Sequence, residues 1–318
     1  MSKALVTGGA GFIGSHMAQR LLDLDWDVTV IDNESTGNPA NVPKGVRYIK
    51  GDVRNRRELA AAFDQPLDLV VHIAGQASTI RSFLDPADDL SVNVNGAIEV
   101  MQAVVEHRVP RVLYASSMTA YGLPQRLPVT EDDPTLPVSY YGITKLAAER
   151  YLLATGMRSD LDAPPNVTAF RMFNVYGPRQ SLSNPYQGVL AIFINAALRG
   201  LPIVIHSDGE QSRDFIFIDD VVNAWIAAID KPASYGQVFN LGSGTLLTVN
   251  RLVDSVLADL GKTREDYEVR YEPVRPGDQR HMQAKIAKAA QLLDWQPQVT
   301  FEQGLQRTIQ WAKTEEES

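Results

Sequence analysis

The chain has 318 residues, of which 44% are hydrophobic and 21% charged, and its net charge is −8. This length allows one large domain and a smaller one, and the spread of the acidic residues disfavours nucleic acid as a partner. Cysteine is absent, which excludes disulfides, thiolate metal sites and cysteine nucleophiles and favours a reducing cytoplasm. No apolar run reaches 18 residues, so no membrane-spanning helix is expected.

The N-terminal half alternates short β-branched or aliphatic runs with longer helical patterns. This order predicts an α/β fold built on a doubly wound parallel sheet of the Rossmann type. Strands are expected at Ala4–Thr7, Asp27–Ile31, Arg47–Lys50, Leu67–His72, Arg111–Ala115 and Thr168–Arg171. Helices are expected at Gly11–Leu24, Arg56–Phe63, Pro86–His107 and Ser139–Thr155.

Beyond Arg171, glycine and proline recur and the helical patterns shorten, which predicts a smaller C-terminal α/β domain. Arg213–Ile218, with the helix after it, and Val238–Leu241 are strand-like enough to return to the first domain. The first domain is therefore expected to cover residues 1–173 with returning segments at about 213–242, and the second to cover 174–212 and 243–318.

A glycine cluster, Gly8, Gly11 and Gly14, stands between the first predicted strand and the first predicted helix, where it also includes Phe12 and Ile13. Small residues at such a turn let backbone N–H groups and the helix N-terminus approach a pyrophosphate. The motif in this context predicts a dinucleotide site.

An acidic residue, Asp32, closes the second predicted strand and is followed by Asn33. A carboxylate there can accept both ribose hydroxyls of an adenosine and would repel a 2′-phosphate, and no arginine or lysine lies between Asn33 and Pro43. NAD is therefore expected rather than NADP. Asp52 and Val53 after the third strand, and Ala74 and Gly75 after the fourth, are expected to line the same cofactor, although Asp52 could equally cap a helix.

Tyr141 and Lys145 lie four residues apart on a predicted helix and therefore on the same face. A lysine held close to a tyrosine favours the phenolate and makes the tyrosine a usable base. Ser117 and Thr119 follow the fifth strand, at the carboxyl edge where the cofactor is expected. Ser117 is predicted to hydrogen-bond the reacting oxygen beside Tyr141.

These motifs, together with V-N-V-N-G at 92–96, R-M-F-N-V-Y-G-P-R at 171–179 and G-E-Q-S-R-D-F at 209–215, resemble the extended short-chain dehydrogenase/reductase family, with the nearest likeness to UDP-glucose 4-epimerases. The resemblance runs from Lys3 to about Trp311. It implies that Tyr141 takes the proton from the sugar 4-hydroxyl while C4 gives hydride to tightly held NAD, and that the 4-keto sugar turns over and is reduced on its other face. Lys145 would lower the tyrosine pKa and bond the nicotinamide ribose.

The resemblance also implies roles for other positions. Ser117, with help from Thr119, would orient the 4-oxygen, Phe173 would pack by the nicotinamide, and Asn95 would lie near the cofactor. The diphosphate and nucleoside of the substrate would be held by Asn174, Gly188, Val189, Arg213, Arg275 and Asp278, because arginine suits a diphosphate. Met282 falls where the family adjusts room beside the sugar C2 substituent, and it leaves N-acetylated sugars open.

Several alternatives remain at this point. Dehydration is disfavoured because Met118 and Thr119 follow Ser117 where a 4,6-dehydratase carries an Asp-Glu pair. A uronate 4-epimerase or decarboxylase would need extra groups for the C6 carboxylate, for which Arg81, Ser78 and Thr119 are candidates, and uronate epimerisation is the runner-up. A non-catalytic NAD- or nucleotide-sensing protein is the remaining rival. The resemblance implies a homodimer through the helices at 86–107 and 139–155, and the five scattered histidines suggest no metal.

Overall fold

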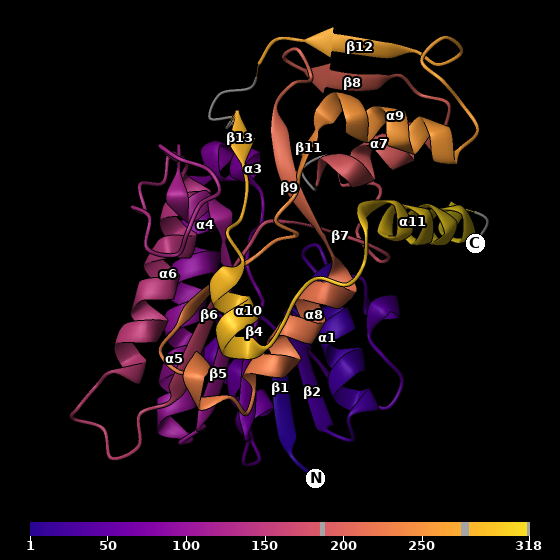
Figure 1. The fold of residues 1–318 in the computed structure, drawn as a ribbon. Helices are drawn as coiled ribbons and strands as arrows, with labels where there is room; N and C mark the ends of the chain where they lie inside the picture. Colours follow the sequence, from indigo (N-terminus) through magenta and orange to yellow (C-terminus); the bar gives the residue numbers. More distant parts are fainter. Residues whose placement is uncertain (185–187, 275–279, 317–318) are drawn as a thin grey trace.

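The computed structural model describes residues 1–184, 188–274 and 280–316 (Figure 1). Seven parallel strands form the main sheet, in the order β10-β6-β5-β4-β1-β2-β3. The six strands predicted for the N-terminal half are all present, so the predicted Rossmann-type fold is confirmed. The seven strands of the sheet are β1 Lys3–Thr7, β2 Asp27–Asp32, β3 Arg47–Lys50, β4 Leu69–His72, β5 Arg111–Ser117, β6 Asn166–Met172 and β10 Val238–Leu241.

Apolar side chains cover both faces of this sheet, because successive residues of a strand point to opposite sides. In β1, Leu5 joins one buried cluster and Val6 joins the other. Figure 1 places α5 and α6 on one side of the sheet and α1 and α8 on the other. These helices are α1 Phe12–Asp23, α5 Gly96–Glu106, α6 Tyr140–Gly156 and α8 Ile218–Ala228, and the short α2 Arg56–Ala60 packs beside α5.

The long helix predicted at 86–107 is interrupted. It consists of α4 (Pro86–Leu90), a π-helical turn over Ser91–Asn95 and α5, and a separate helix α3 (Thr79–Leu84) precedes it. A π turn inserts one extra residue, which the apolar periodicity of a sequence does not reveal. The predicted start of α6 is confirmed: Ser139 is its N-cap and accepts a hydrogen bond from the Gly142 N–H.

The C-terminal part forms a second layered region that overhangs the carboxyl edge of the main sheet (Figure 1). Its strand β9 pairs with three short strands, and a separate pair is formed by β8 and β12. The strands are β7 Asn174–Tyr176, β8 Ile203–His206, β9 Ser212–Phe217, β11 Leu246–Thr248, β12 Val269–Glu272 and β13 His281–Met282. The helices are α7 Val189–Leu198, α9 Val249–Asp259, α10 Ala287–Leu293 and α11 Phe301–Glu316.

The chain does return to the main sheet, but not through the strand at 212–217. That strand, β9, belongs to the smaller sheet, where it pairs with β11 and β13. Both partners come from later in the chain, so the local sequence pattern does not predict this pairing. The following helix α8 packs on α1, and β10 then extends the main sheet beside β6.

A buried ion pair fixes α6 to the main sheet. The Arg171 guanidinium, 2% exposed and in β6, donates to Glu149 of α6 at 2.6 Å and 3.0 Å, and the Ser116 hydroxyl donates to the same carboxylate at 2.6 Å. Removing one partner of such a pair typically costs about 3–5 kcal/mol, because a charge is then left buried. The pair therefore holds the helix that carries Tyr141 against the strand that leads to Phe173. Within the described ranges, no helix has the length and apolar character needed to span a membrane.

Candidate active site

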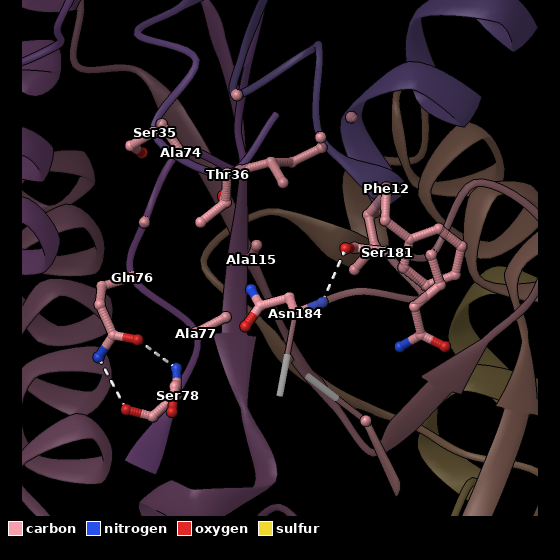
Figure 2. A pocket seen from close by; sticks show the side chains of 18 of the residues that line it. Phe12, Ser35, Thr36, Ala74, Gln76, Ala77, Ser78, Ala115, Ser181 and Asn184 are labelled. Carbon is pink, nitrogen blue, oxygen red and sulfur yellow. Dashed lines mark hydrogen bonds between the residues drawn. The ribbon is translucent and has the colours of Figure 1, made fainter. Parts of the chain in front are cut away.

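A cavity of about 1330 Å³ lies over the carboxyl ends of the main-sheet strands and extends under the C-terminal region. Figure 2 shows that its labelled wall residues come from distant parts of the chain, with Ala74, Gln76 and Ser78 on one side and Phe12, Ser181 and Asn184 on another. Ligands of open α/β sheets bind at this edge, outside the strand ends. The cavity is therefore the candidate active site.

The glycine turn after β1 forms one end of the cavity. Gly8 has a φ of +71°, and a methyl group on Gly14 would lie 2.1 Å from the Gly8 carbonyl oxygen, so neither position accepts a side chain without strain. No side chain caps the first turn of α1, and Gly11, Phe12, Ile13 and Gly14 all line the cavity. Uncapped N–H groups at a helix start fit the pyrophosphate of a dinucleotide.

Asp32 is held in place at the end of β2. Its carboxylate accepts the Ala10 N–H at 3.0 Å and the Glu34 N–H at 2.8 Å, and its side chain lines the cavity beside Asn33. Burial raises the pKa of Asp32, while the two backbone hydrogen bonds act in the other direction. A carboxylate fixed in this way fits the ribose diol of an adenosine.

Asp52 and Val53 also line the cavity, next to Asp32. The Asn33 side-chain amide donates to Asp52 at 3.0 Å, and Arg54 donates to both of its oxygens at 3.0 Å and 2.7 Å. Hydrogen bonds from Arg54 are the main cause that lowers the pKa of Asp52 to about 2. Arg54 lines the cavity and was not anticipated from the sequence, although its position two residues after Asp52 was a usable signal.

The two predicted catalytic residues of the helix α6, Tyr141 and Lys145, line the cavity together with Ser117 at the end of β5. Burial raises the pKa of Tyr141 to about 12, and a hydrogen bond with Ser117 acts in the opposite direction. Lys145 is not among the groups that lower the pKa of Tyr141 here, which differs from the predicted effect of the lysine. The physical reason is that burial lowers the pKa of Lys145, so the lysine loses its charge at a pH below that at which Tyr141 ionises.

Burial lowers the pKa of Lys145 to about 7, against the raising effects of Asp89 and Glu149. Its side chain is 5% exposed, and Nζ lies 4.5 Å from the centre of the Tyr114 ring. A methyl group on Gly75 would lie 2.8 Å from the Asn93 side-chain oxygen, so this position accepts no larger residue unless Asn93 moves. Ala74 and Phe173 line the cavity nearby.

Thr119 lies behind Ser117 and is not among the residues that line the cavity. Its hydroxyl donates to Ser117 Oγ at 2.9 Å, and its backbone N–H donates to the same atom at 3.2 Å. Any influence of Thr119 on a ligand therefore passes through Ser117.

The predicted cofactor residue Asn95 does not lie at the cavity. Asn95 is exposed and does not line the cavity, whereas Asn93 is 2% exposed and accepts the Gln76 N–H at 2.9 Å. The assignment of Asn95 rested on the family likeness, and in this structure Asn95 ends the π-helical turn with its side chain exposed. The asparagine beside the Gly75 loop is Asn93, and Gln76 was also not anticipated.

The predicted substrate residues divide into three groups. Asn174, Gly188 and Val189 line the cavity. Arg213 does not line the cavity, and its Nη1 donates to the Ser212 carbonyl at 2.9 Å. Met282 is fully buried in a small apolar cluster with Tyr121, Val129, Phe173 and Ala284. Arg275 and Asp278 lie outside the described residues.

Other cationic and polar side chains line the cavity without having been assigned to the main site: Arg54, Arg81, Arg179, Gln180 and Ser181. Of the residues considered for a uronate carboxylate, Ser78 and Arg81 line the cavity. Ser78 caps α3 by accepting the Arg81 N–H, and Arg81 pairs with Asp88 at 3.4 Å. Across the described part of the chain, no three His, Asp or Glu side chains gather as a metal site would require.

Comparison with known proteins agrees with this geometry. The chain is 35% identical to a UDP-glucose 4-epimerase of Mycolicibacterium smegmatis over 97% of this chain and 98% of the relative. A crystal structure of UDP-glucose 4-epimerase with UDP-glucose from Thermotoga maritima superposes with a TM-score of 0.93 at 34% identity, covering 98% of this chain and 99% of the other. A UDP-N-acetylglucosamine 4-epimerase from Methanobrevibacter ruminantium, in complex with UDP-N-acetylmuramic acid, superposes with a TM-score of 0.90 at 33% identity, covering 99% of each.

Residues 4–242 match the family model described as "NAD dependent epimerase/dehydratase family". The match spans the glycine turn, Asp32 and the Ser117, Tyr141 and Lys145 set, which are the features that form the cavity. The chain therefore belongs to the NAD-dependent epimerase/dehydratase family and is an NAD-dependent enzyme.

Proposed function

We propose that this enzyme epimerises a nucleotide sugar at C4 through a transient 4-keto sugar, with UDP-glucose and UDP-galactose as its substrate pair. The observation that carries the proposal is that Ser117, Tyr141 and Lys145 line one cavity with the glycine turn and Asp32. A base and a hydroxyl donor beside a dinucleotide site are what oxidation of an alcohol requires.

In this proposal NAD, when bound, supplies the reversible oxidation at C4. The glycine turn and the first turn of α1 would hold its pyrophosphate, Asp32 its adenosine ribose, and Lys145 and Phe173 its nicotinamide end. Asn33, Asp52, Val53, Ala74 and Gly75 would complete that binding surface.

Tyr141 would take the proton of the sugar 4-hydroxyl and later return it. A phenol with a pKa near 12 is protonated at neutral pH and cannot accept a proton, so the pKa of Tyr141 must be lower in the loaded enzyme. In this structure the hydrogen bond with Ser117 is the contribution that lowers the pKa of Tyr141. In the loaded enzyme a protonated Lys145 would also favour the phenolate. With substrate bound, the single hydrogen of the Ser117 hydroxyl would turn from Tyr141 to the sugar 4-oxygen and hold C4 beside the cofactor.

The nucleotide part of the substrate would lie under the C-terminal region, where Asn174, Gly188 and Val189 line the cavity. We assign residues 1–173 and the returning segments within 213–242 to cofactor binding, and residues 174–212 and 243–318 to nucleotide-sugar binding. Arg213, Arg275 and Asp278 remain candidates for the substrate diphosphate and ribose on the strength of the family likeness.

The base is tested with Tyr141→Phe, which removes only the phenolic oxygen. We expect NAD binding within about twofold of wild type and a loss of sugar turnover of about a hundredfold to ten-thousandfold, since a general base contributes roughly 10²–10⁴ in rate. Tyr140→Phe is the matched control, because Tyr140 is the adjacent tyrosine, 46% exposed, and should keep its turnover. Wild-type turnover in Tyr141→Phe would contradict the assignment.

The substrate is tested by incubating the enzyme separately with UDP-glucose, UDP-N-acetylglucosamine and UDP-glucuronate and following the products by NMR. Conversion of UDP-glucose to UDP-galactose is the expected result. The runner-up is 4-epimerisation of UDP-glucuronate, which is supported by Arg81 and Ser78 on the cavity wall. No conversion of any of the three would redirect the search to sugars carrying other nucleotides.

We also propose a homodimer through α5 and α6. Tyr140, Ile143 and Tyr151 of α6 are each about half exposed, at 46%, 48% and 54%, and Leu90 of α4 is 50% exposed. Apolar side chains gathered on one helix face favour association. A monomeric mass in solution at micromolar concentration would contradict this.

The cytoplasm is the compartment we propose, on the absence of cysteine from the sequence.

A further inference from the structure

A carboxylate with no direct catalytic assignment lies behind the cavity wall. Asp89 of α4 is 1% exposed, yet three side-chain donors surround it. Gln76 Nε2 donates to Oδ1 at 2.7 Å, Asn93 Nδ2 donates to Oδ1 at 3.1 Å, and the Thr144 hydroxyl donates to Oδ2 at 2.8 Å. Burial raises the pKa of Asp89, while the hydrogen bonds from Thr144 and Gln76 and the charge of Lys145 act in the opposite direction and favour the ionised carboxylate.

Each donor belongs to a part of the candidate active site. Gln76 follows Gly75 in the loop after β4 and lines the cavity, and Figure 2 shows its side chain bonded to Ser78. Asn93 lies in the π-helical turn, and its amide also bonds the Gln76 carbonyl at 3.1 Å. Thr144 lies on α6 between Tyr141 and Lys145. One carboxylate thus joins the cofactor-side loop to the helix that carries the proposed base.

Asp89 is also electrostatically coupled to Lys145. Asp89 and Glu149 are the two carboxylates that raise the pKa of Lys145 against the effect of burial. Glu149 is already paired with Arg171 at 2.6 Å and bonded by Ser116. Within the described residues no lysine or arginine forms an ion pair with Asp89 at 4 Å or less, whereas its neighbour Asp88 pairs with Arg54 and Arg81.

The remaining groups near Lys145 do not supply a compensating charge. The Tyr114 ring lies against Nζ, and burial raises the pKa of Tyr114 well above its ordinary value, so it stays neutral. Burial lowers the pKa of His72 to about 3, so this imidazole is neutral as well. Asp89 is therefore the carboxylate whose charge is available to the ammonium.

We propose that Asp89 is a positioning residue of this active site: its carboxylate holds Thr144, and with it α6, in a fixed position beside the Gly75-Gln76 loop, and its negative charge stabilises the protonated form of Lys145. The inference rests on the roles proposed above for Tyr141 and Lys145. It assigns to Asp89 no contact with substrate or cofactor.

The charge is tested by NMR titration of protein labelled with carbon-13 at the lysine ε carbon, with the Lys145 signal assigned by its loss in Lys145→Met. We expect a wild-type midpoint near the pKa of about 7 and a midpoint lower by about one unit or more in Asp89→Asn. Glu106→Gln, an exposed charge at the end of α5, is the control and should leave the midpoint unchanged. An unchanged midpoint in folded Asp89→Asn would overturn the proposed charge effect.

The positioning of α6 by Asp89 is tested with Thr144→Val, which keeps the charge of Asp89 and removes the hydroxyl that donates to it. We expect kcat to fall about tenfold with KM for the sugar nearly unchanged, as for loss of one hydrogen bond to a charged group, and Thr144→Ser to restore kcat. Wild-type kcat in Thr144→Val would overturn the positioning role, and this variant carries the test if Asp89→Asn does not fold. The titration requires no sugar, so its outcome is separable from failure of the proposed reaction.

Discussion

The hydroxyl of Thr119 donates a hydrogen bond to Ser117 Oγ across 2.9 Å, and the Thr119 backbone N–H donates a second across 3.2 Å. A serine oxygen has two lone pairs and one hydrogen. With both lone pairs occupied, the Ser117 hydrogen is directed to another acceptor, which is the arrangement a donor to a reacting oxygen needs. Thr119 thereby sets the direction of a hydrogen bond that it does not make itself.

Thr119→Val should therefore lower kcat by about tenfold while KM changes little, because the Ser117 hydroxyl is freed to rotate. Ser117→Ala should lower kcat more, by roughly a hundredfold or beyond, because the donor itself is removed. Thr119→Ser is the control and should retain wild-type kcat. Steady-state kinetics on the converted sugar measures all three, and equal losses in Thr119→Val and Ser117→Ala would contradict the indirect role.

Lys145 makes the stability of the cofactor-free protein depend on pH. Its pKa falls from 10.5 to about 7 on folding, so between these values the unfolded chain binds more protons than the folded one, and folding is favoured as pH rises. Below about pH 7 the full penalty applies, up to about 5 kcal/mol for this shift. Lys145→Met should therefore be more stable than wild type, with an advantage that is largest at or below pH 7 and shrinks toward pH 10. Urea unfolding of both proteins at pH 6.5 and pH 9 measures this difference, and an advantage independent of pH would contradict it.

Met282 was predicted to contact the sugar, but it is fully buried against Phe173, Tyr121 and Val129. Met282→Ala should therefore destabilise the protein by about 2–5 kcal/mol, because a cavity is left in the apolar cluster. Met157→Ala, at a side chain that is 74% exposed, should change stability by less than about 0.5 kcal/mol. Denaturant unfolding measures both variants. Met282→Ala could instead keep its stability and change the preference between UDP-glucose and UDP-N-acetylglucosamine. That result would support the predicted position of Met282 beside the sugar C2 substituent.

Several features of the site followed from the sequence because their determinants are local. The glycines after β1 and the carboxylate that ends β2 stand at fixed positions relative to their strands, and parallel strands bring their carboxyl ends to one edge. Tyr141 and Lys145 lie on one face because an α-helix places residues four apart together. Ser117 joins them because β5 ends at the same edge.

The errors arose where position depends on contacts distant in the chain. The side chain of Asn95 is exposed at the end of the π-helical turn, and the asparagine that bonds the loop after β4 is Asn93, which accepts the Gln76 N–H. β9 lies in the smaller sheet and not in the main one, because it pairs with β11 and β13, and Met282 on β13 is buried in an apolar cluster.

The amino-acid sequence by itself determined the fold class, the dinucleotide turn and the Ser117, Tyr141 and Lys145 set, because strand ends and helical spacing are short-range properties of a chain. Only the tertiary structure decided the surroundings of those groups: the Thr119 hydroxyl behind Ser117, the buried Lys145 with its pKa of about 7, and the Asp89 carboxylate that reaches Gln76, Asn93 and Thr144. Burial and charge coupling depend on which segments pack together, and that is a property of the folded molecule as a whole.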